Sequence, residues 1–403
     1  MEIISGGVCA AKGYKANGVY CGIRRNKDKK DLALIISEVP AAAAAVYTTN
    51  LVKGAPLLLD MEHLKNGSAQ AIICNSGNAN TCNANGMEIA AQMSELVEQY
   101  TGVTSNDVLV ASTGVIGQPL DIAPIANGMK PLCTGLGNHS HEAAAAIMTT
   151  DTQMKEIAVT FEIDGVTCTI GGIAKGSGMI HPNMATMLVF ITSDVAISHE
   201  MLQKALRTDI ANTFNMLSID GDTSTNDMVI VMANGMAGNK TIDCDGEAFN
   251  IFAKALNTIT VHLCRKIAGD GEGATKLLEC IVDGAKDEEC AKKTAKSVIC
   301  SSLLKAAMFG ADANWGRVLC AIGYSGEDID ISKVDVKFKS AKGTIPVCKN
   351  GAGVDFSEEL AKEILLEDEI EILVSLNAGT YGATAWGCDL TYDYVRINGD
   401  YRT

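Results

Sequence analysis

A stretch crowded with loop-forming residues passes directly into an apolar run near the middle of the chain. Residues 175–194 read KGSGMIHPNMATMLVFITSD. Glycine, proline and asparagine fill the first half, whereas residues 186–192 are apolar and rich in β-branched side chains, which is typical of a buried strand. So elaborate a turn would be needed if the hydroxyl of Thr186, or the peptide bond before it, took part in chemistry.

A threonine hydroxyl becomes a nucleophile only when a base removes its proton, and the free α-amino group of an N-terminal threonine is one such base. Freeing that amine requires the Thr186 hydroxyl to attack the carbonyl of Ala185, which gives an ester that water opens. This reaction needs a strained turn and hydrogen-bond donors for the oxyanion. The structural alternative is that Thr186 simply begins a strand, and residue type alone favours it.

Other matches to common motifs are weak. Residues 302–305 fit Ser-x-x-Lys but lack the companion elements of penicillin-binding enzymes. Residues 220–227 begin like a calcium loop but lack its glycine and final glutamate, so we expect a capped polar loop near a pocket. Residues 269–273 (GDGEG) have the spacing of neither phosphate-binding glycine motif. No cysteine–histidine set supports a metal site, and His139 and His141 are expected to face solvent.

Charge and composition exclude several classes of protein. With 48 acidic and 33 basic residues the net charge is −15, which disfavours nucleic acid as a partner. Residues 24–30 (RRNKDKK) are locally basic, and a solvated turn is favoured there over a phosphate-binding patch. No apolar run approaches the ~18 residues needed to span a bilayer. The 14 cysteines are dispersed and residues 1–7 do not resemble a signal peptide, so we expect free thiols and a cytoplasmic location.

The elements that must position these residues follow from apolar periodicity. Strands are predicted at residues 32–37, 69–74, 108–112, 156–163, 166–171, 186–192, 228–232, 258–268, 334–338, 343–348 and 369–375. Helices are predicted at residues 87–101, 141–148, 198–214, 246–256, 273–284 and 357–366. Asp164-Gly165 predicts a hairpin turn, and the tail at residues 391–403 looks partly β-like.

Nine segments, in order along nearly the full chain, resemble the ArgJ family of glutamate N-acetyltransferases/ornithine acetyltransferases, which cleave themselves. The segments are residues 46–50 (VYTTN, followed by Ala55-Pro56), 75–80 (NSGNAN), 112–117 (STGVIG), 149–152 (TTDT), 175–188 (KGSGMIHPNMATML), 220–227 (DGDTSTND), 269–273 (GDGEG), 312–317 (DANWGR) and 396–403 (RINGDYRT).

The resemblance implies a role for each matching position. The bond between Ala185 and Thr186 would be cleaved, and Thr186 would become an N-terminal nucleophile that carries the acyl group. Thr113 and Gly114 match the oxyanion-hole pair. The substrate-binding positions that match are Thr152, Lys175, Thr186, Glu272, Asn398 and Thr403. A lysine, a glutamate, an amide and the terminal carboxylate suit an amino acid with an amine, a carboxylate and an acetamide.

The resemblance also implies a layered α/β fold of the self-cleaving N-terminal-nucleophile type. Residues 1–185 and 186–403 would form the alpha and beta chains of an α2β2 heterotetramer. A soft boundary near residue 290 would separate a smaller C-terminal α/β domain, residues 291–395, and the tail at residues 396–403 would return to the active site. No metal or organic cofactor is expected, and acetyl-CoA is left open as an additional acetyl donor.

The activity implied is ping-pong transfer of an acetyl group from N2-acetyl-L-ornithine to L-glutamate in arginine biosynthesis. Two alternatives remain at this stage. A self-cleaving aminopeptidase or amidase would pass the acyl group to water, and an unprocessed binding protein would perform no chemistry. Release of free acetate in place of acetylglutamate would indicate the first alternative. A single uncleaved chain on a denaturing gel would indicate the second.

Overall fold

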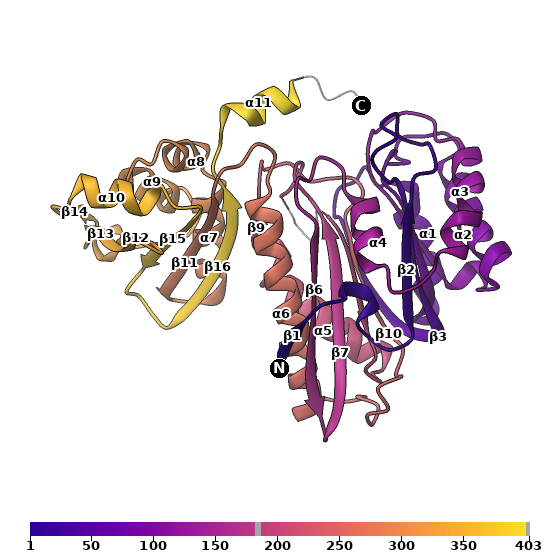
Figure 1. The fold of residues 1–403 in the computed structure, drawn as a ribbon. Coiled ribbons are helices and arrows are strands. Elements are labelled where there is room, and N and C mark those ends of the chain that lie inside the picture. Colours follow the sequence, from indigo (N-terminus) through magenta and orange to yellow (C-terminus); the bar gives the residue numbers. More distant parts are fainter. Residues whose placement is uncertain (182–186, 400–403) are drawn as a thin grey trace.

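The computed structural model describes residues 1–181 and 187–399, which form two β-sheets with helices packed around them (Figure 1). The larger sheet has the strand order β1-β6-β7-β8-β10-β3-β4-β5, with β2 paired to β3. Its strands are β1 (Glu2–Ile4), β2 (Tyr14–Val19), β3 (Leu32–Tyr47), β4 (Ser68–Asn75), β5 (Val108–Ser112), β6 (Lys155–Ile163), β7 (Val166–Lys175), β8 (Leu188–Ser193) and β10 (Met228–Ala233).

The second sheet is built mainly from the C-terminal part of the chain, in the order β14-β13-β12-β15-β11-β16-β9. Its strands are β9 (Leu217–Ser218), β11 (Leu277–Ala285), β12 (Asp335–Ser340), β13 (Gly343–Lys349), β14 (Ala352–Gly353), β15 (Glu369–Ser375) and β16 (Tyr381–Cys388). Apart from the short β9, all strands of this sheet lie at or after β11, which starts before residue 290. The division of the chain into domains stays a prediction.

Helices cover both sheets and complete the layers. They are α1 (Ala55–His63), α2 (Gly86–Thr101), α3 (Ile122–Thr134), α4 (Ser140–Ile147), α5 (His199–Ile210), α6 (Glu247–Gly269), α7 (Glu288–Cys300), α8 (Ser302–Phe309), α9 (Trp315–Gly323), α10 (Glu358–Leu365) and α11 (Tyr392–Asn398). Short 3₁₀ turns are η1 (Gly7–Cys9), η2 (Leu64–Asn66), η3 (Ser105–Asp107), η4 (Phe214–Met216) and η5 (Ile331–Lys333). The helix α6 lies between the sheets and packs against β6 and β7 on one side and β11 and β16 on the other (Figure 1).

The layered α/β class predicted from the sequence is confirmed. The predicted strands at residues 32–37, 69–74, 108–112, 228–232 and 369–375 lie within β3, β4, β5, β10 and β15. The hairpin between β6 and β7 turns at Asp164 and Gly165, whose φ angles of 51° and 77° are the left-handed values that such a two-residue turn requires. The helix predicted at residues 198–214 is shorter than expected, because α5 ends at Ile210.

One helix, α6, replaces the helix predicted at residues 246–256 and the strand predicted at residues 258–268. The β-branched run around Thr258 favoured a strand, but Phe252, Leu256, Ile259 and Leu263 recur at helical spacing and are all fully buried. Because this apolar stripe fills the space between the two sheets, tertiary packing outweighs the local β preference.

The helix predicted at residues 273–284 is also wrong, because residues 277–285 form the strand β11. This strand lies inside the second sheet, parallel to β15 and antiparallel to β16. Leu278, Cys280 and Val282 alternate along it and are buried, which is the period of a strand.

The tail predicted as partly β-like contains the helix α11. The side chain of Thr391 accepts hydrogen bonds from the N–H groups of Asp393 and Tyr394 and so caps the start of the helix. Figure 1 shows α11 above β16 and the space between the two sheets, so that the end of the described chain points toward the N-terminal half.

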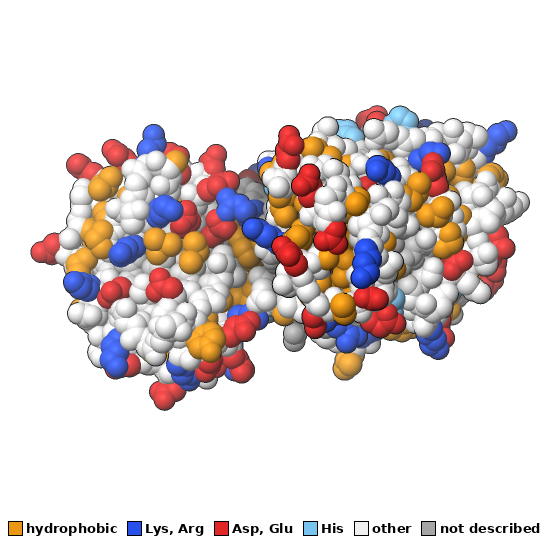
Figure 2. All heavy atoms as spheres, turned by 90° about the horizontal axis from the view of Figure 1, so that it is seen from below, with side chains coloured by type: hydrophobic (Ala, Val, Ile, Leu, Met, Phe, Trp, Pro, Cys, Tyr) orange, Lys and Arg blue, Asp and Glu red, His pale blue; other side chains and the backbone are white. Residues whose placement is uncertain are grey.

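Acidic and basic side chains are interspersed over the face seen from below, without a broad basic field (Figure 2). Among the helices of residues 1–181 and 187–399, none has both the length and the apolar character required to cross a membrane.

Candidate active site

A cavity opens where the end of β7 and the starts of β8 and β10 meet. Lys175 ends β7 and pairs with Leu188, which in turn pairs with Met228 at the start of β10. The side chains that line the cavity therefore come from strand ends and the loops beside them, where a rigid sheet can hold them. The lining residues are Ala79, Thr113, Gly114, Ile116, Thr149, Thr150, Lys175, Gly178, Met179, Met187, Leu188, Ser224, Thr225, Asn226, Asp227, Glu272 and Asn398.

Five of the residues singled out from the sequence come together here: Thr113, Gly114, Lys175, Glu272 and Asn398. They are spread over nearly 300 positions of the sequence, so only the fold brings them together. Their individual roles stay predictions.

The other four predicted residues are not among those that line the cavity in the described part of the chain. Ala185, Thr186 and Thr403 lie outside the described residues. Met187, the residue after Thr186, lines the cavity. Thr152 does not line the cavity; it is exposed, and its N–H and its hydroxyl both donate to the carboxylate of Asp270.

The backbone at Thr113 and Gly114 has a conformation suited to binding an oxyanion. The N–H of Thr113 donates to the carbonyl of Asn75 at 3.0 Å, which leaves its hydroxyl as the donor for a ligand. Within residues 1–181 and 187–399, the N–H of Gly114 has no acceptor. A Cβ on Gly114 would lie 2.6 Å from the carbonyl carbon of Gly77, and its φ of +129° favours glycine.

A buried amide network fixes this turn. The Asn75 side chain accepts from the N–H groups of Gly77 and Asn78 and donates to the hydroxyl of Ser112 at 2.7 Å. From the other side, the Asn226 amide donates to the carbonyl of Ser112 at 3.0 Å. These bonds explain the asparagine-rich segment at residues 75–80, since each amide both donates and accepts.

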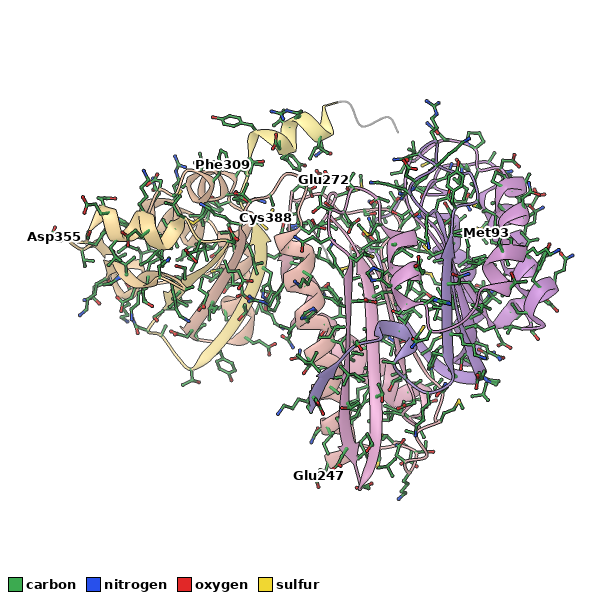
Figure 3. The ribbon with its side chains drawn as sticks, in the orientation of Figure 1. Met93, Glu247, Glu272, Phe309, Asp355 and Cys388 are labelled. Carbon is green, nitrogen blue, oxygen red and sulfur yellow. The ribbon has the colours of Figure 1, made fainter. Side chains whose placement is uncertain are left out.

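Glu272 and Asn398 form one wall. The Asn398 amide donates to Glu272 Oε2 at 2.7 Å, although the residues are 126 positions apart. Glu272 lies below α11 (Figure 3). Glycines permit this closeness, because a Cβ on Gly178 would lie 2.3 Å from the Glu272 carboxylate and one on Gly273 would lie 2.7 Å from the Tyr394 nitrogen. Gly273 of the segment at residues 269–273 thus allows α11 to approach closely.

A buried ionic cluster supports the cavity from behind. Lys155 Nζ lies 2.6 Å from both Asp151 Oδ1 and Asp270 Oδ2, and all three side chains are almost completely buried. Burial alone would raise the pKa of Asp151, but Lys155, Lys175 and the N–H of Gly176 outweigh it and hold that pKa well below its usual value. The cluster ties the start of β6 and the end of β7 to the loop after α6.

Asp227 is a lining residue that sequence reasoning did not single out. It is 3% exposed, and its Oδ2 has no hydrogen-bond partner among the described residues. Burial raises the pKa of this carboxyl well above its usual value, against the opposing effects of Ser224 and Lys175. The only signal was its place in the polar loop at residues 220–227, which was expected to lie near a pocket.

The arrangement provides hydrogen-bond donors, a buried cation and carboxyl groups around a small space, and this suits binding of a zwitterionic amino acid. In the described part of the chain, no cluster of three or more histidine, cysteine, aspartate or glutamate side chains is placed to hold a metal ion. His139 and His141 are exposed, as expected.

Comparisons with known proteins show the family to which the chain belongs. The sequence pattern of the ArgJ family matches residues 15–403. The chain is 52% identical over 405 residues to the arginine biosynthesis bifunctional protein ArgJ of Caldanaerobacter subterraneus subsp. tengcongensis, with all of both chains covered. It is 50% identical over 392 residues to ArgJ 1 of Clostridium acetobutylicum, covering 97% of this chain and 96% of the relative.

A solved structure is also similar. The crystal structure of arginine biosynthesis bifunctional protein ArgJ from Bacillus halodurans is 47% identical, with a TM-score of 0.50, and the match covers 52% of this chain and 97% of that one. The chain belongs to the ArgJ family, because the family pattern matches residues 15–403 and a member is 52% identical over the full length.

Proposed function

We propose that the protein transfers the acetyl group of N2-acetyl-L-ornithine to L-glutamate, giving L-ornithine and N-acetyl-L-glutamate in arginine biosynthesis. The observation that carries this proposal is that Thr113, Gly114, Lys175, Glu272 and Asn398 line one cavity beside Met187, in a chain of the ArgJ family.

The proposed reaction begins with self-cleavage between Ala185 and Thr186. The Thr186 hydroxyl then attacks the acetamide carbonyl of acetylornithine, with the Thr186 α-amine taking the proton. The Thr113 hydroxyl and the Gly114 N–H stabilise the oxyanion, and each such donor is worth about 10²–10³-fold in rate. Ornithine leaves, and the amine of glutamate takes the acetyl group from the ester.

The charged residues of the cavity suit the ends of both substrates. Lys175, which is 7% exposed, would bind a carboxylate. Glu272, held by Asn398, would bind an ammonium group. The terminal carboxylate of Thr403 and the side chain of Thr152 belong to the same proposed set, as substrate-binding groups.

The length of the Bacillus halodurans chain supports cleavage. That chain matches over 97% of its length yet spans 52% of this one, which is close to the share that residues 186–403 would form. We further propose an α2β2 assembly of the cleaved chains, acetyl-CoA as a second donor and a cytoplasmic location, where the 14 free cysteines would stay reduced.

Intact mass under denaturing conditions tests the proposal. Fresh protein should give two fragments, one starting at Thr186, and incubation with acetylornithine should add one acetyl group to that fragment. Thr186→Ala should abolish both changes, whereas Thr186→Ser, which keeps a hydroxyl, should still be cleaved. Two fragments from Thr186→Ala would refute the role of Thr186, and release of free acetate in place of acetylglutamate would favour the hydrolase alternative.

A further inference from the structure

Asp227 lines the candidate active site and takes no part in the reaction proposed above. It immediately precedes β10, whose first residue, Met228, pairs with Leu188 at the start of β8. The N–H of Met228 donates to the carbonyl of Met187 at 2.8 Å. The sheet therefore fixes Asp227 close to Met187, the residue that follows the proposed nucleophile.

One oxygen of the Asp227 carboxyl is available for proton transfer. Oδ2 is buried and has no hydrogen-bond partner among residues 1–181 and 187–399. Ser224 offers its hydroxyl and its N–H to the same carboxyl, and Ser224 itself is half-buried and lines the cavity. Because a hydroxyl both donates and accepts, Ser224 can pass a proton between the buried carboxyl and a ligand in the cavity.

The other titratable side chains in the described lining, Lys175 and Glu272, suit binding better than proton exchange. The Lys175 ammonium has donors only and would hold a substrate carboxylate. Glu272 accepts from the Asn398 amide at 2.7 Å and would hold an ammonium group. Burial of Asp227 instead favours its neutral form and raises its pKa well above the usual value, while Ser224 and Lys175 oppose that shift. A carboxyl whose pKa is raised from the acid range can both give and take a proton near neutral pH.

The proposed transfer leaves one proton without an acceptor. Glutamate enters with a protonated amine, and its nitrogen loses two protons before it becomes the amide of acetylglutamate. One of these protons passes through the α-amine of Thr186 to the Thr186 oxygen as the ester bond breaks. The second needs another acceptor near the reacting nitrogen. Ornithine presents the reverse case, because its nitrogen gains two protons to leave as an ammonium ion and the Thr186 hydroxyl supplies only one.

We propose that Asp227, with the Ser224 hydroxyl as its relay, exchanges this second proton with the substrate amine. The inference rests on the proposed function. In the first half of the reaction, the neutral carboxyl gives a proton to the departing amine of ornithine as the amide bond breaks. In the second half, the carboxylate takes a proton from the ammonium group of glutamate as the new carbon–nitrogen bond forms. The two steps balance, so the carboxyl returns to its starting state in each cycle.

Two acceptors that differ in charge test the inference. Acetyl-enzyme is prepared with acetylornithine, freed of ornithine and mixed with glutamate or hydroxylamine near neutral pH, and intact mass times the loss of the acetyl group. Hydroxylamine attacks as a neutral amine, so it loses only one proton and the Thr186 oxygen takes it. Asp227→Asn should therefore lower the rate with glutamate by about 10²-fold and keep the rate with hydroxylamine near the parent value.

Two further variants sharpen the comparison. Ser224→Ala removes the relay and keeps the carboxyl, so it should lower the rate with glutamate alone. Asp60→Asn is the matched control, because Asp60 on α1 is fully buried and its Oδ2 also lacks a partner in the described part of the chain. Burial raises the pKa of Asp60 too, but Asp60 does not line the cavity, so this variant should change neither rate.

The other outcomes overturn the inference in distinguishable ways. Equal losses with both acceptors in Asp227→Asn would show a general defect of the site, and unchanged rates would show that another group takes the proton. If Asp227→Asn does not fold or is not cleaved, the same comparison in Ser224→Ala decides, and equal or unchanged rates there refute the relay. A parent protein that gains no acetyl group from acetylornithine would refute the proposed function itself, whereas transfer to glutamate that does not depend on Asp227 would leave that function intact.

Discussion

Replacing Lys155 with methionine should strongly destabilise the protein, because it leaves two buried carboxylates without their shared cation. Lys155 and Asp151 are fully buried, and Asp270 is 4% exposed. Methionine keeps the length and much of the volume of the lysine side chain, so the substitution removes charge with little change in packing.

The magnitude follows from the geometry of the cluster. At 2.6 Å, Coulomb's law with an effective dielectric constant of about 20 gives ~6 kcal/mol for each pair, much of which desolvation cancels. Loss of one partner from a buried ion pair typically costs about 3–5 kcal/mol, and we expect Lys155→Met to lie in this range.

The deficit should depend on pH with a definite sign. In the parent, the pKa of Asp151 is lower in the folded state, so its stabilising contribution is present above the unfolded value of about 4 and is lost as the pH falls through the folded value. The variant lacks most of this contribution. The difference in unfolding free energy should therefore be largest near neutral pH and should shrink in acid.

Urea unfolding followed by circular dichroism measures the effect. Lys204→Met is the matched control, because Lys204 pairs with Asp245 at the surface, where the side chains are 48% and 70% exposed. That pair should be worth less than about 1 kcal/mol. Adding Asp151→Asn to Lys155→Met should recover part of the loss. If Lys155→Met unfolded as the control does, the cluster would not stabilise the fold and the reasoning would fail.

Gly114→Ala should lower kcat by about 10²-fold or more, because a Cβ would close the turn proposed to bind the oxyanion. Gly323→Ala is the control and should keep its kcat, because a Cβ there would meet nothing within 4 Å and the backbone is not left-handed; equal losses in both variants would contradict the role of Gly114. Burial, with the charge of Lys296, lowers the pKa of His181 from 6.5 to about 4, so stability should fall as the pH drops between these values and His181→Gln should flatten that segment of the thermal-unfolding profile; an unchanged profile would exclude His181. Deletion of residues 398–403 removes the amide bound to Glu272 and should impair transfer in a steady-state assay, and wild-type-like turnover would count against the tail.

Local sequence signals predicted the elements whose side chains follow one clear period. The strands β4, β5 and β15 and the helix α2 lie where apolar runs, alternation or amphipathic spacing placed them. The same signals failed at α6 and β11, because the choice between helix and strand there depends on the second sheet, which local periodicity does not describe.

The sequence alone determined the kind of chemistry that the chain could perform. Nine segments in order along the chain resemble the ArgJ family, and this resemblance, rather than residue type alone, predicted acyl transfer through Thr186 with Thr113 and Gly114 as oxyanion donors. The sequence did not single out Asp227, because what distinguishes this residue is a raised pKa that results from burial in the folded chain.

Only the tertiary structure decided which of these residues share a space. Lys175, Glu272 and Asn398 meet because β7, the loop after α6 and α11 converge above the ends of the central strands. The basic run at residues 24–30 is largely exposed, as the predicted solvated turn requires, and part of it also lines a cavity beside Gly114. It lies there because the buried Asp31 accepts from the N–H of Arg24 and the Arg24 guanidinium donates to the carbonyl of Ser76. Burial, charge and proximity between distant segments arise only when the chain is packed, so they cannot be read from local pattern.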